Sequence, residues 1–266
     1  MNQPAEVQDD TAAAQPTPIY RKYGVNGWED IEGQVIIEAP VALTVNGEMW
    51  LTFMCTPAQL DALAAGFLFN EGVLHSTEEI EILRPCENNS NVDVWLKHNV
   101  KRPNKWQRTS GCTGGFTSVV VPKGLKPLPA TLRITPADLA AGMDQLIHVE
   151  GLYQEFRGMH CSGLSDGTEI RYHAADIGRH NTIDKLAGLY LLEPRPMPYK
   201  MVLTTGRISS EMLQKSVRLG AEVFVSRTSP TSMAVALADR LGLTLIGYAR
   251  RETFIVYTHT ERIDAV

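Results

Sequence analysis

The hydrophobic positions of the chain follow a strand pattern in its N-terminal part and an alternating strand and helix pattern afterwards. Within residues 19–105, the apolar runs Val41–Val45 and Met49–Phe53 flank Asn46-Gly47, which is a strong signal for a tight hairpin turn. Apolar residues at helical spacing over residues 60–68 interrupt these strands. We therefore expect residues 19–105 to form a β-rich N-terminal subdomain with one helix.

Residues 106–266 are predicted to form an α/β core. Apolar positions predict a helix over residues 136–156, and alternating strands and helices follow after residue 167. The expected strands are residues 169–175, 201–204, 222–226, 243–248 and 254–258, and the expected helices are residues 181–192, 210–219 and 230–241. Such short crossovers predict a layered α/β/α core with a mixed, mostly parallel sheet.

Composition narrows the class of protein. The chain has 266 residues, of which 44% are hydrophobic, so it can bury a full core. Its net charge of −5 argues against a general nucleic-acid binder. Residues 1–18 carry acidic residues and prolines but no Lys or Arg, and they predict a disordered leader rather than a signal peptide. With no run of about 18 apolar residues, we expect a cytoplasmic protein that does not enter the membrane.

One cysteine, Cys112, stands between glycines in the run Thr109–Gly115. Glycine has access to positive φ and lacks side-chain bulk, so the thiol can stand at the tip of an open loop. Arg108 and Lys105 lie just upstream and favour the thiolate, which is the reactive form of cysteine. The segment predicts a reactive thiol, with an ordinary glycine-rich turn as the alternative.

The other cysteines show no metal-binding or redox spacing. No pair among the four cysteines is separated by the two residues of a zinc knuckle or a redox dithiol, so we expect neither a permanent metal nor a disulfide. Cys55 has the apolar neighbours of a core residue, and Cys86 fits a loop. Cys161 follows His160 and is a second candidate thiol.

Three turns between a predicted strand and the next helix are rich in arginine, hydroxyl and amide side chains. They are residues 176–181, 204–210 and 226–231. In an open α/β sheet such turns lie at the carboxyl edge, where ligands bind, and helix N-termini there bind phosphate.

These turns predict an anionic ligand that carries several phosphates. The candidate binding residues are Arg179, His180, Arg207 and Ser209. In the third turn, Ser229 is predicted as the helix N-cap, with Pro230 in the first helical position. The alternative is that the polar residues are ordinary helix caps and that the arginines form surface ion pairs.

Two enzyme classes can be compared with these residues. A zinc deaminase needs His-x-Glu and Pro-Cys-x-x-Cys, but the glutamate is missing after His160 and His173, and Asn89 stands where the second cysteine belongs. A cysteine hydrolase needs a histidine base for its thiol. The candidate bases for Cys112 are His160, His173 and His180. Neither class explains phosphate-binding turns beside an exposed thiol.

Four blocks of the chain resemble the FdhD (NarQ) family of formate dehydrogenase accessory sulfurtransferases. They are residues 65–72, 176–185, 206–215, and 243–248 running on to 256–258. The resemblance implies an α/β fold related to the cytidine deaminases, and a homodimer. It also implies a sulfur carrier that accepts sulfur from a cysteine desulfurase as a persulfide. The sulfur is then passed to the molybdenum or tungsten bis(guanine dinucleotide) cofactor of formate dehydrogenase.

By position, the resemblance assigns the persulfide to Cys112. The contact segment for the cofactor falls on Tyr248, Ala249, Arg250, Arg251, Glu252 and Thr253. Many family members have Cys-x-x-Cys at the loop, whereas the second position here is Gly115. Cys112 therefore passes its sulfur directly to the metal, or Cys161 closes on it from elsewhere in the fold. A chaperone that delivers the cofactor without transferring sulfur is the alternative function.

Overall fold

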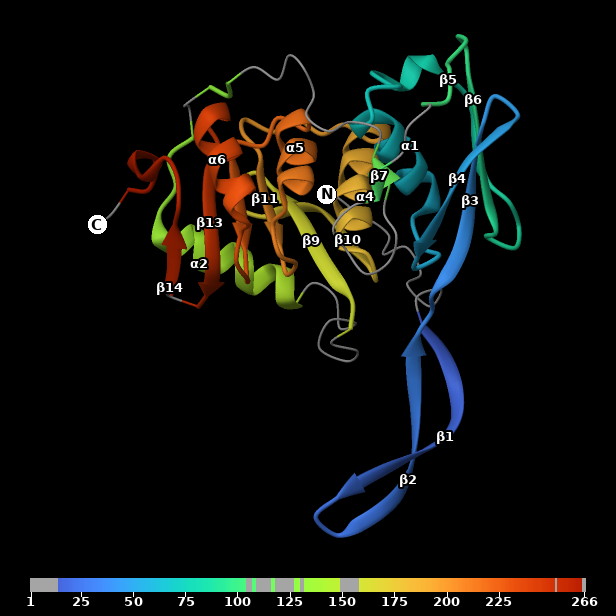
Figure 1. Ribbon diagram of the computed structural model, residues 1–266. Coiled ribbons are helices and arrows are strands. Elements are labelled where there is room, and N and C mark those ends of the chain that lie inside the picture. Colours follow the sequence, from blue (N-terminus) through green and yellow to red (C-terminus); the bar gives the residue numbers. More distant parts are fainter. Residues whose placement is uncertain are drawn as a thin grey trace, which may run out of the picture.

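The computed structural model describes residues 14–103, 107–108, 116–117, 127–129, 132–148, 158–251 and 253–264. These residues form an α/β core, a smaller β-rich part beside it, and a two-stranded arm that projects away from both (Figure 1).

The core is built on a six-stranded sheet with the strand order β10-β9-β11-β12-β13-β14. Its strands are β9 (His160–Ser165), β10 (Ile170–Asp176), β11 (Met201–Thr204), β12 (Val223–Ser226), β13 (Thr244–Arg250) and β14 (Thr253–Val256). Strands β10 to β13 run in one direction, and β9 and β14 run in the other. The sheet is mixed as predicted, but the expectation of a mostly parallel sheet is wrong, since three of its five strand pairs are antiparallel.

Strand β9 accounts for much of this difference, because the sequence did not predict it. Its small and polar residues replace the branched apolar residues that are typical of a buried strand. The strand is buried from Cys161 onwards, and its polar groups are paired inside the core. The Ser162 hydroxyl lies 2.7 Å from the Thr182 hydroxyl and donates a hydrogen bond to the Thr204 hydroxyl (2.9 Å).

Helices cover both faces of the sheet, so the predicted α/β/α layering is present. Helix α2 (Pro136–His148) covers one face, and α4 (Arg179–Leu192), α5 (Ser210–Arg218) and α6 (Ser232–Leu241) cover the other (Figure 1). Met201 and Leu203 of β11 pack in the cluster with α2, whereas Val202 between them packs in the cluster with α4, α5 and α6. Residues 149–156, the predicted end of the first helix of the core, lie outside the described residues. The relation to cytidine deaminases stays a prediction.

The β-rich part agrees with the strand and helix pattern expected there. Its four-stranded sheet has the order β4-β3-β6-β5. The strands are β3 (Ala39–Val45), β4 (Glu48–Cys55), β5 (Ile80–Pro85) and β6 (Asn91–Leu96), and helix α1 (Leu60–Asn70) packs against them. Asn46 and Gly47 both have positive φ, 49° and 79°, as a two-residue hairpin turn requires.

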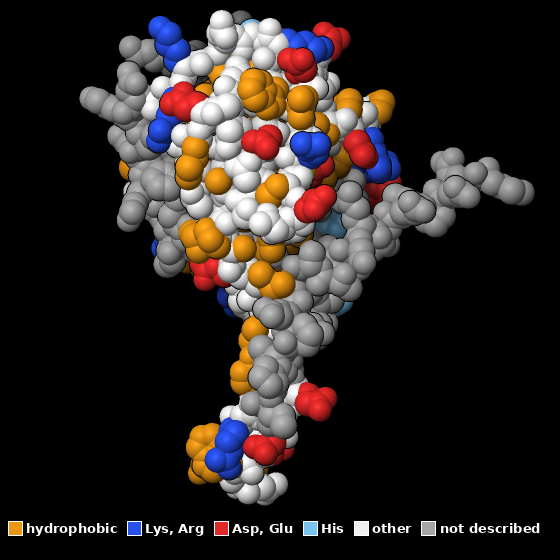
Figure 2. Space-filling view, turned by 90° about the vertical axis from the view of Figure 1, so that its right-hand side faces the viewer, with side chains coloured by type: hydrophobic (Ala, Val, Ile, Leu, Met, Phe, Trp, Pro, Cys, Tyr) orange, Lys and Arg blue, Asp and Glu red, His pale blue; other side chains and the backbone are white. Residues whose placement is uncertain are grey.

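The arm consists of β1 (Ala14–Gly24) and β2 (Gly27–Ile36), which pair only with each other. Strand β1 begins inside the segment predicted as a leader, and residues 1–13 lie outside the described residues. In the view of Figure 2 the arm extends below the body, and apolar side chains lie among charged and polar ones on the face above it. The arm exposes Tyr23 and Trp28, whose rings meet edge to face.

The β-rich part joins the core through a close crossing of α1 and α4. A Cβ on Gly66 of α1 would overlap the backbone carbonyl of Asp184, and a Cβ on Gly188 of α4 would overlap that of Ala62. Glycine at both positions therefore lets the two helix backbones come into direct contact. Each glycine costs about 1 kcal/mol of helix propensity relative to alanine, and the close packing offsets this cost.

A buried ion pair of the core lies at the same junction and bonds to the segment before α1. The Lys185 ammonium lies 2.7 Å from the Asp176 carboxylate, and both side chains are fully buried. Lys185 also donates hydrogen bonds to the carbonyls of Thr56 and Ala175, at 3.1 Å each, and the Thr56 N–H donates to Asp176 (3.2 Å). The two charges neutralise each other, and Thr56, in the segment before α1, supplies hydrogen bonds to both. Replacing either Lys185 or Asp176 with an uncharged residue would therefore leave the other charge buried and uncompensated.

Replacing Gly66 or Gly188 with alanine is expected to lower the free energy of unfolding by about 3 kcal/mol. The added methyl group has to displace a backbone carbonyl rather than the end of a flexible side chain. Urea unfolding followed by circular dichroism measures the change. Gly24→Ala is the control, because a Cβ there meets no atom within 4 Å. Equal unfolding midpoints for all three variants would contradict the packing argument.

Candidate functional site

The carboxyl ends of β10, β11, β12 and β13 lie at one edge of the six-stranded sheet, because these strands run in the same direction. The amino end of β9 lies there too, since β9 runs the opposite way. The three polar turns of the sequence, residues 176–181, 204–210 and 226–231, leave the sheet at this edge, as does the segment after β13. The tertiary structure thus gathers four polar segments at the kind of edge where α/β proteins bind ligands.

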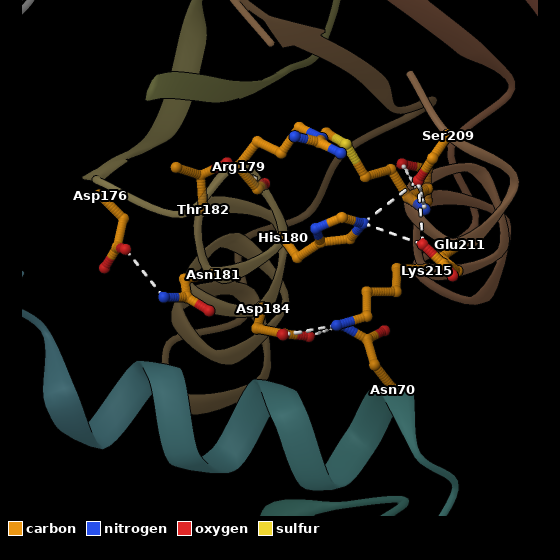
Figure 3. Close-up of polar contacts among 12 residues, drawn as sticks. Asn70, Asp176, Arg179, His180, Asn181, Thr182, Asp184, Ser209, Glu211 and Lys215 are labelled. Carbon is orange, nitrogen blue, oxygen red and sulfur yellow. Dashed lines mark hydrogen bonds and ion pairs between the residues drawn. The ribbon is translucent and has the colours of Figure 1, made fainter. Parts of the chain in front are cut away.

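In the first turn, the side chains of Asp176 and Asn181 form hydrogen bonds within the protein. Asp176 accepts hydrogen bonds from the Gly178 N–H and from the Asn181 amide, at 2.8 Å each (Figure 3). The Asn181 amide also donates to the Met54 carbonyl (3.0 Å). Because these groups are buried and paired, they hold the turn against the β-rich part and do not face a ligand.

Arg179 and His160 approach each other at this edge, beside Gly206. Arg179 is the first residue of α4, and His160 is the first residue of β9. A Cβ on Gly206 would lie 3.0 Å from the Arg179 Cβ and 3.3 Å from the His160 Nδ1, so glycine allows the three segments to meet. Burial, together with the positive charge of Arg179, holds the pKa of His160 below its ordinary value. The sequence offered His160 only as one of three candidate bases, and the pairing of β9 with β11 places it here.

The second and third turns are held together by backbone hydrogen bonds. The Ile208 N–H donates to the Ser229 carbonyl (3.3 Å), and the Thr231 N–H donates to the Ile208 carbonyl (2.9 Å). Helix α6 therefore begins only after Thr231, whose hydroxyl accepts the cap hydrogen bond from the Ala234 N–H (3.2 Å). The prediction of Ser229 as N-cap is wrong, because its backbone pairs with the neighbouring turn.

The segment after β13 contains a backbone irregularity. Tyr248 has a φ of 53°, in the left-handed region that bulky residues rarely adopt, and its N–H donates to the Thr228 carbonyl (3.0 Å). The pairing of β13 with β14 shifts register between Gly247 and Arg250, which is typical of a β-bulge. The bulge leaves Tyr248 and Arg250 exposed and Ala249 buried in the core.

Arginine dominates the charge at this edge. Arg207, Arg250 and Arg251 are exposed, whereas Arg179 is buried. The Thr253 hydroxyl donates to the Arg250 carbonyl (3.2 Å), and Glu252 lies outside the described residues. An exposed guanidinium group can donate two parallel hydrogen bonds to the oxygens of one phosphate, and a helix N-terminus nearby favours the same anion.

His180 and Ser209, both predicted to bind the ligand, contact each other. The His180 Nε2 lies 3.2 Å from the Ser209 hydroxyl and 3.1 Å from the Glu211 carboxylate (Figure 3). The Ser209 hydroxyl caps α5 by accepting a hydrogen bond from the Met212 N–H (3.3 Å). A nucleophilic triad needs its serine and its carboxylate on opposite nitrogens of the imidazole. Both partners share one nitrogen here, so this cluster is no hydrolase triad.

The cysteines differ in their surroundings. Cys112 lies outside the described residues. On either side of it in the sequence, β7 (Gln107–Arg108) pairs with β8 (Phe116–Thr117). Cys161 is 2% exposed in the core beneath α2. Burial raises the pKa of Cys55 to about 12. Cys86 is partly exposed, and a hydrogen bond with Ser90 helps to lower its pKa.

Two further features concern metal ions and membranes. Within the described residues, no group of three or more His, Cys, Asp or Glu side chains is placed to hold a metal ion. No helix in the described part of the chain has the length and apolar character needed to cross a membrane.

The fold and the site define an α/β protein with an arginine-rich carboxyl edge, and comparisons with known proteins give its family. The FdhD/NarQ family matches residues 36–264. The sulfur carrier protein FdhD of Bacillus subtilis (strain 168) is 34% identical over 239 residues, which cover 88% of this chain and 91% of that protein. The corresponding protein of Staphylococcus haemolyticus (strain JCSC1435) is 32% identical over 247 residues, which cover 88% and 94%.

A crystal structure of a candidate formate dehydrogenase accessory protein from Desulfotalea psychrophila has a similar fold. It matches with a TM-score of 0.77 and 28% identity, covering 94% of this chain and 99% of the other. The chain therefore belongs to the FdhD/NarQ family.

The stability of the protein is expected to depend on the protonation of His180. Burial lowers the pKa of His180 to about 4, and the hydrogen bond to Glu211 opposes this shift only in part. The unfolded value is about 6.5, so the unfolded chain binds the proton more tightly and stability falls as the pH drops from about 6.5 towards about 4. Between about pH 7.5 and pH 5 the loss from this group is about 2 kcal/mol.

Urea unfolding of the wild type and of His180→Gln at these two pH values measures this loss. Glutamine keeps a hydrogen-bond donor but does not titrate, so the variant should lose about 2 kcal/mol less than the wild type on acidification. Other groups, including His160, titrate in both proteins and cancel in the difference. Identical losses in the two proteins would show that His180 is not the group responsible.

Proposed function

We propose that the chain is a sulfur carrier that takes sulfur from a cysteine desulfurase as a persulfide on Cys112. The persulfide sulfur is passed to the molybdenum or tungsten bis(guanine dinucleotide) cofactor that formate dehydrogenase requires. Membership of the FdhD/NarQ family supports this proposal, since the matched relatives bear the name sulfur carrier protein FdhD. The observation that carries it is the arginine-rich edge at which four strands end, because this edge suits a ligand with several phosphates.

The cofactor is the substrate of this reaction, and its phosphates are the groups that the edge would bind. Arg207, Arg250 and Arg251 are exposed there and would contact phosphate oxygens directly. Arg179 adds positive charge at the start of α4. Tyr248, whose side chain is exposed, would complete the contact segment that the family resemblance assigns, together with Ala249, Glu252 and Thr253.

The direct route for sulfur is the one that we propose. In the loading step, the Cys112 thiolate attacks the outer sulfur of the desulfurase persulfide, and the desulfurase thiolate leaves. In the delivery step, the bond between the Cys112 sulfur and the outer sulfur would break and the Cys112 thiolate would leave. The outer sulfur would bind the substrate's metal as sulfide, and the reduced metal would supply the two electrons that this change requires. Cys161 is 2% exposed among core side chains, so closing it on Cys112 would require part of the core to open. Its burial therefore favours the route without a disulfide.

A chaperone that binds and delivers the cofactor without transferring sulfur is the second candidate. Gly115 in place of a second loop cysteine is the feature that favours it. A homodimer, implied by the family resemblance, belongs to both proposals.

Incubation with a cysteine desulfurase and cysteine is expected to add one sulfur, about 32 Da, to the intact protein, and dithiothreitol should remove it. Cys112→Ala should abolish both this gain and the activation of formate dehydrogenase. Cys161→Ser and Cys86→Ala are matched controls, of which the first replaces a core thiol and the second a partly exposed one. Both controls should keep the mass gain.

Each contrary outcome identifies a different failure. A gain that survives Cys112→Ala but disappears in Cys86→Ala or Cys161→Ser would assign the persulfide to that other cysteine. Activation of formate dehydrogenase without any mass gain would favour the chaperone. A disulfide between Cys112 and Cys161, mapped after turnover, would overturn the direct route.

The phosphate contacts can be tested with guanosine diphosphate. Arg207→Ala and Arg250→Ala should each weaken its binding roughly ten- to hundred-fold, the usual cost of one charge-assisted hydrogen bond. Isothermal titration calorimetry measures the affinity. Arg240→Ala is the control, because Arg240 is exposed in the last turn of α6, at the end remote from the edge. Unchanged affinity in both test variants would show that Arg207 and Arg250 do not contact the phosphates and are ordinary surface residues.

A further inference from the structure

His180 contacts the start of α5, so its side chain is engaged within the protein rather than directed at a ligand. We propose that His180 is a positioning residue, which fixes the spacing between the turn of Arg179 and the turn of Arg207 without touching the bound nucleotide. The inference rests on the proposed function, because the spacing matters only if both turns bind one ligand.

The imidazole connects the two turns through one atom. His180 follows Arg179 in the first turn of α4, and Ser209, the N-cap of α5, comes two residues after Arg207. The His180 Nε2 lies 3.2 Å from the Ser209 hydroxyl and 3.1 Å from the Glu211 carboxylate. The His180 side chain is 6% exposed, so it contacts α5 rather than solvent.

The hydrogen bonds in this cluster satisfy one another. The Glu211 carboxylate only accepts, so the neutral imidazole must carry its hydrogen on Nε2. The Ser209 hydroxyl accepts from the Met212 N–H (3.3 Å) and donates to Glu211 (3.3 Å). Removing the imidazole would take away the donor that faces both Ser209 and Glu211, and the start of α5 would lose its link to α4.

A second contact between α4 and α5 holds the two helices together independently of His180. The His180 contact therefore affects the position of the turns rather than the stability of the whole fold. Asp184 and Lys215, each four residues further along its helix, form an ion pair of 2.5 Å, and the Asn70 amide of α1 donates to Asp184 (2.7 Å) (Figure 3). This deeper pair holds the two helices together. The His180 contact lies at their amino ends, where the arginine turns begin.

Burial is the main reason that His180 stays neutral, and the neighbouring charges act in both directions. Glu211 and Lys215 face it from α5, and Arg179 adjoins it on α4. Burial and the two cations disfavour a protonated ring, while Glu211 favours it. A neutral donor gives the link a fixed hydrogen-bond direction near neutral pH.

The test measures guanosine diphosphate affinity by calorimetry. His180→Leu removes the donor and should weaken binding on the order of ten-fold, the size expected when neighbouring residues are coupled. His180→Gln offers an amide donor in place of Nε2 and should restore most of the affinity. Ile183→Val, in the core of the same helix, is the matched control for a general loss of stability and should bind as the wild type does.

The double variant His180→Leu with Arg207→Ala separates positioning from a structural defect. If His180 acts by placing Arg207, then Arg207→Ala should cost clearly less affinity in the His180→Leu background than in the wild type. Should His180→Leu fail to fold, Glu211→Ala removes the other half of the link at a more exposed position and should show the same coupling.

The outcomes separate the two proposals. A wild type that does not bind guanosine diphosphate would overturn the proposed phosphate site and this inference with it. An Arg207→Ala variant with unchanged affinity would remove Arg207 from the site and overturn the positioning role, while Arg250→Ala still tests the site. An effect of Arg207→Ala that is the same in both backgrounds, or a His180→Leu variant that binds as the wild type, would overturn the positioning role alone.

Discussion

The direct contact between α1 and α4 is the constraint on which the rest of the structure depends. Gly66 and Gly188 let the two backbones touch. The buried pair of Lys185 and Asp176 lies at the same junction and forms hydrogen bonds with Thr56 across it. Asp176 also holds the turn that leads into α4, through the Gly178 N–H and the Asn181 amide. The crossing that joins the β-rich part to the core therefore also fixes the first of the polar turns.

The direction of the strands then decides where the functional groups meet. Four strands of the core sheet run the same way, so their following turns leave at one edge, and the reversed strand β9 adds His160 to that edge. Backbone hydrogen bonds from Ile208 to Ser229 and from Tyr248 to Thr228 join successive turns. The edge is thus a set of mutually supported loops on a rigid sheet, which is how α/β proteins commonly hold an anionic ligand.

The polar residues of the family blocks divide into three groups with different tasks. Asp176, Asn181, Asp184 and Lys185 are buried and paired, so they are structural parts of the junction. Arg207 and Arg250 are exposed and available to a ligand. His180 and Ser209 were predicted to bind the ligand, but their side chains contact each other at the starts of α4 and α5. They therefore form a third group, which links two helices.

The sequence by itself determined most helices and strands of the core, the hairpin at Asn46-Gly47 and the family, because these follow from local periodicity, turn chemistry and motif order. It also picked out the three arginine-bearing turns. Only the tertiary structure decided the direction of β9, whose small and polar residues give no strand signal, and with it the mixed sheet and the place of His160. The N-cap of α6 and the partners of His180 were likewise settled by contacts between segments distant in sequence. Hydrogen bonds between segments distant in sequence cannot be predicted from a local pattern. They determine which polar side chains are paired inside the protein and which remain exposed to a ligand.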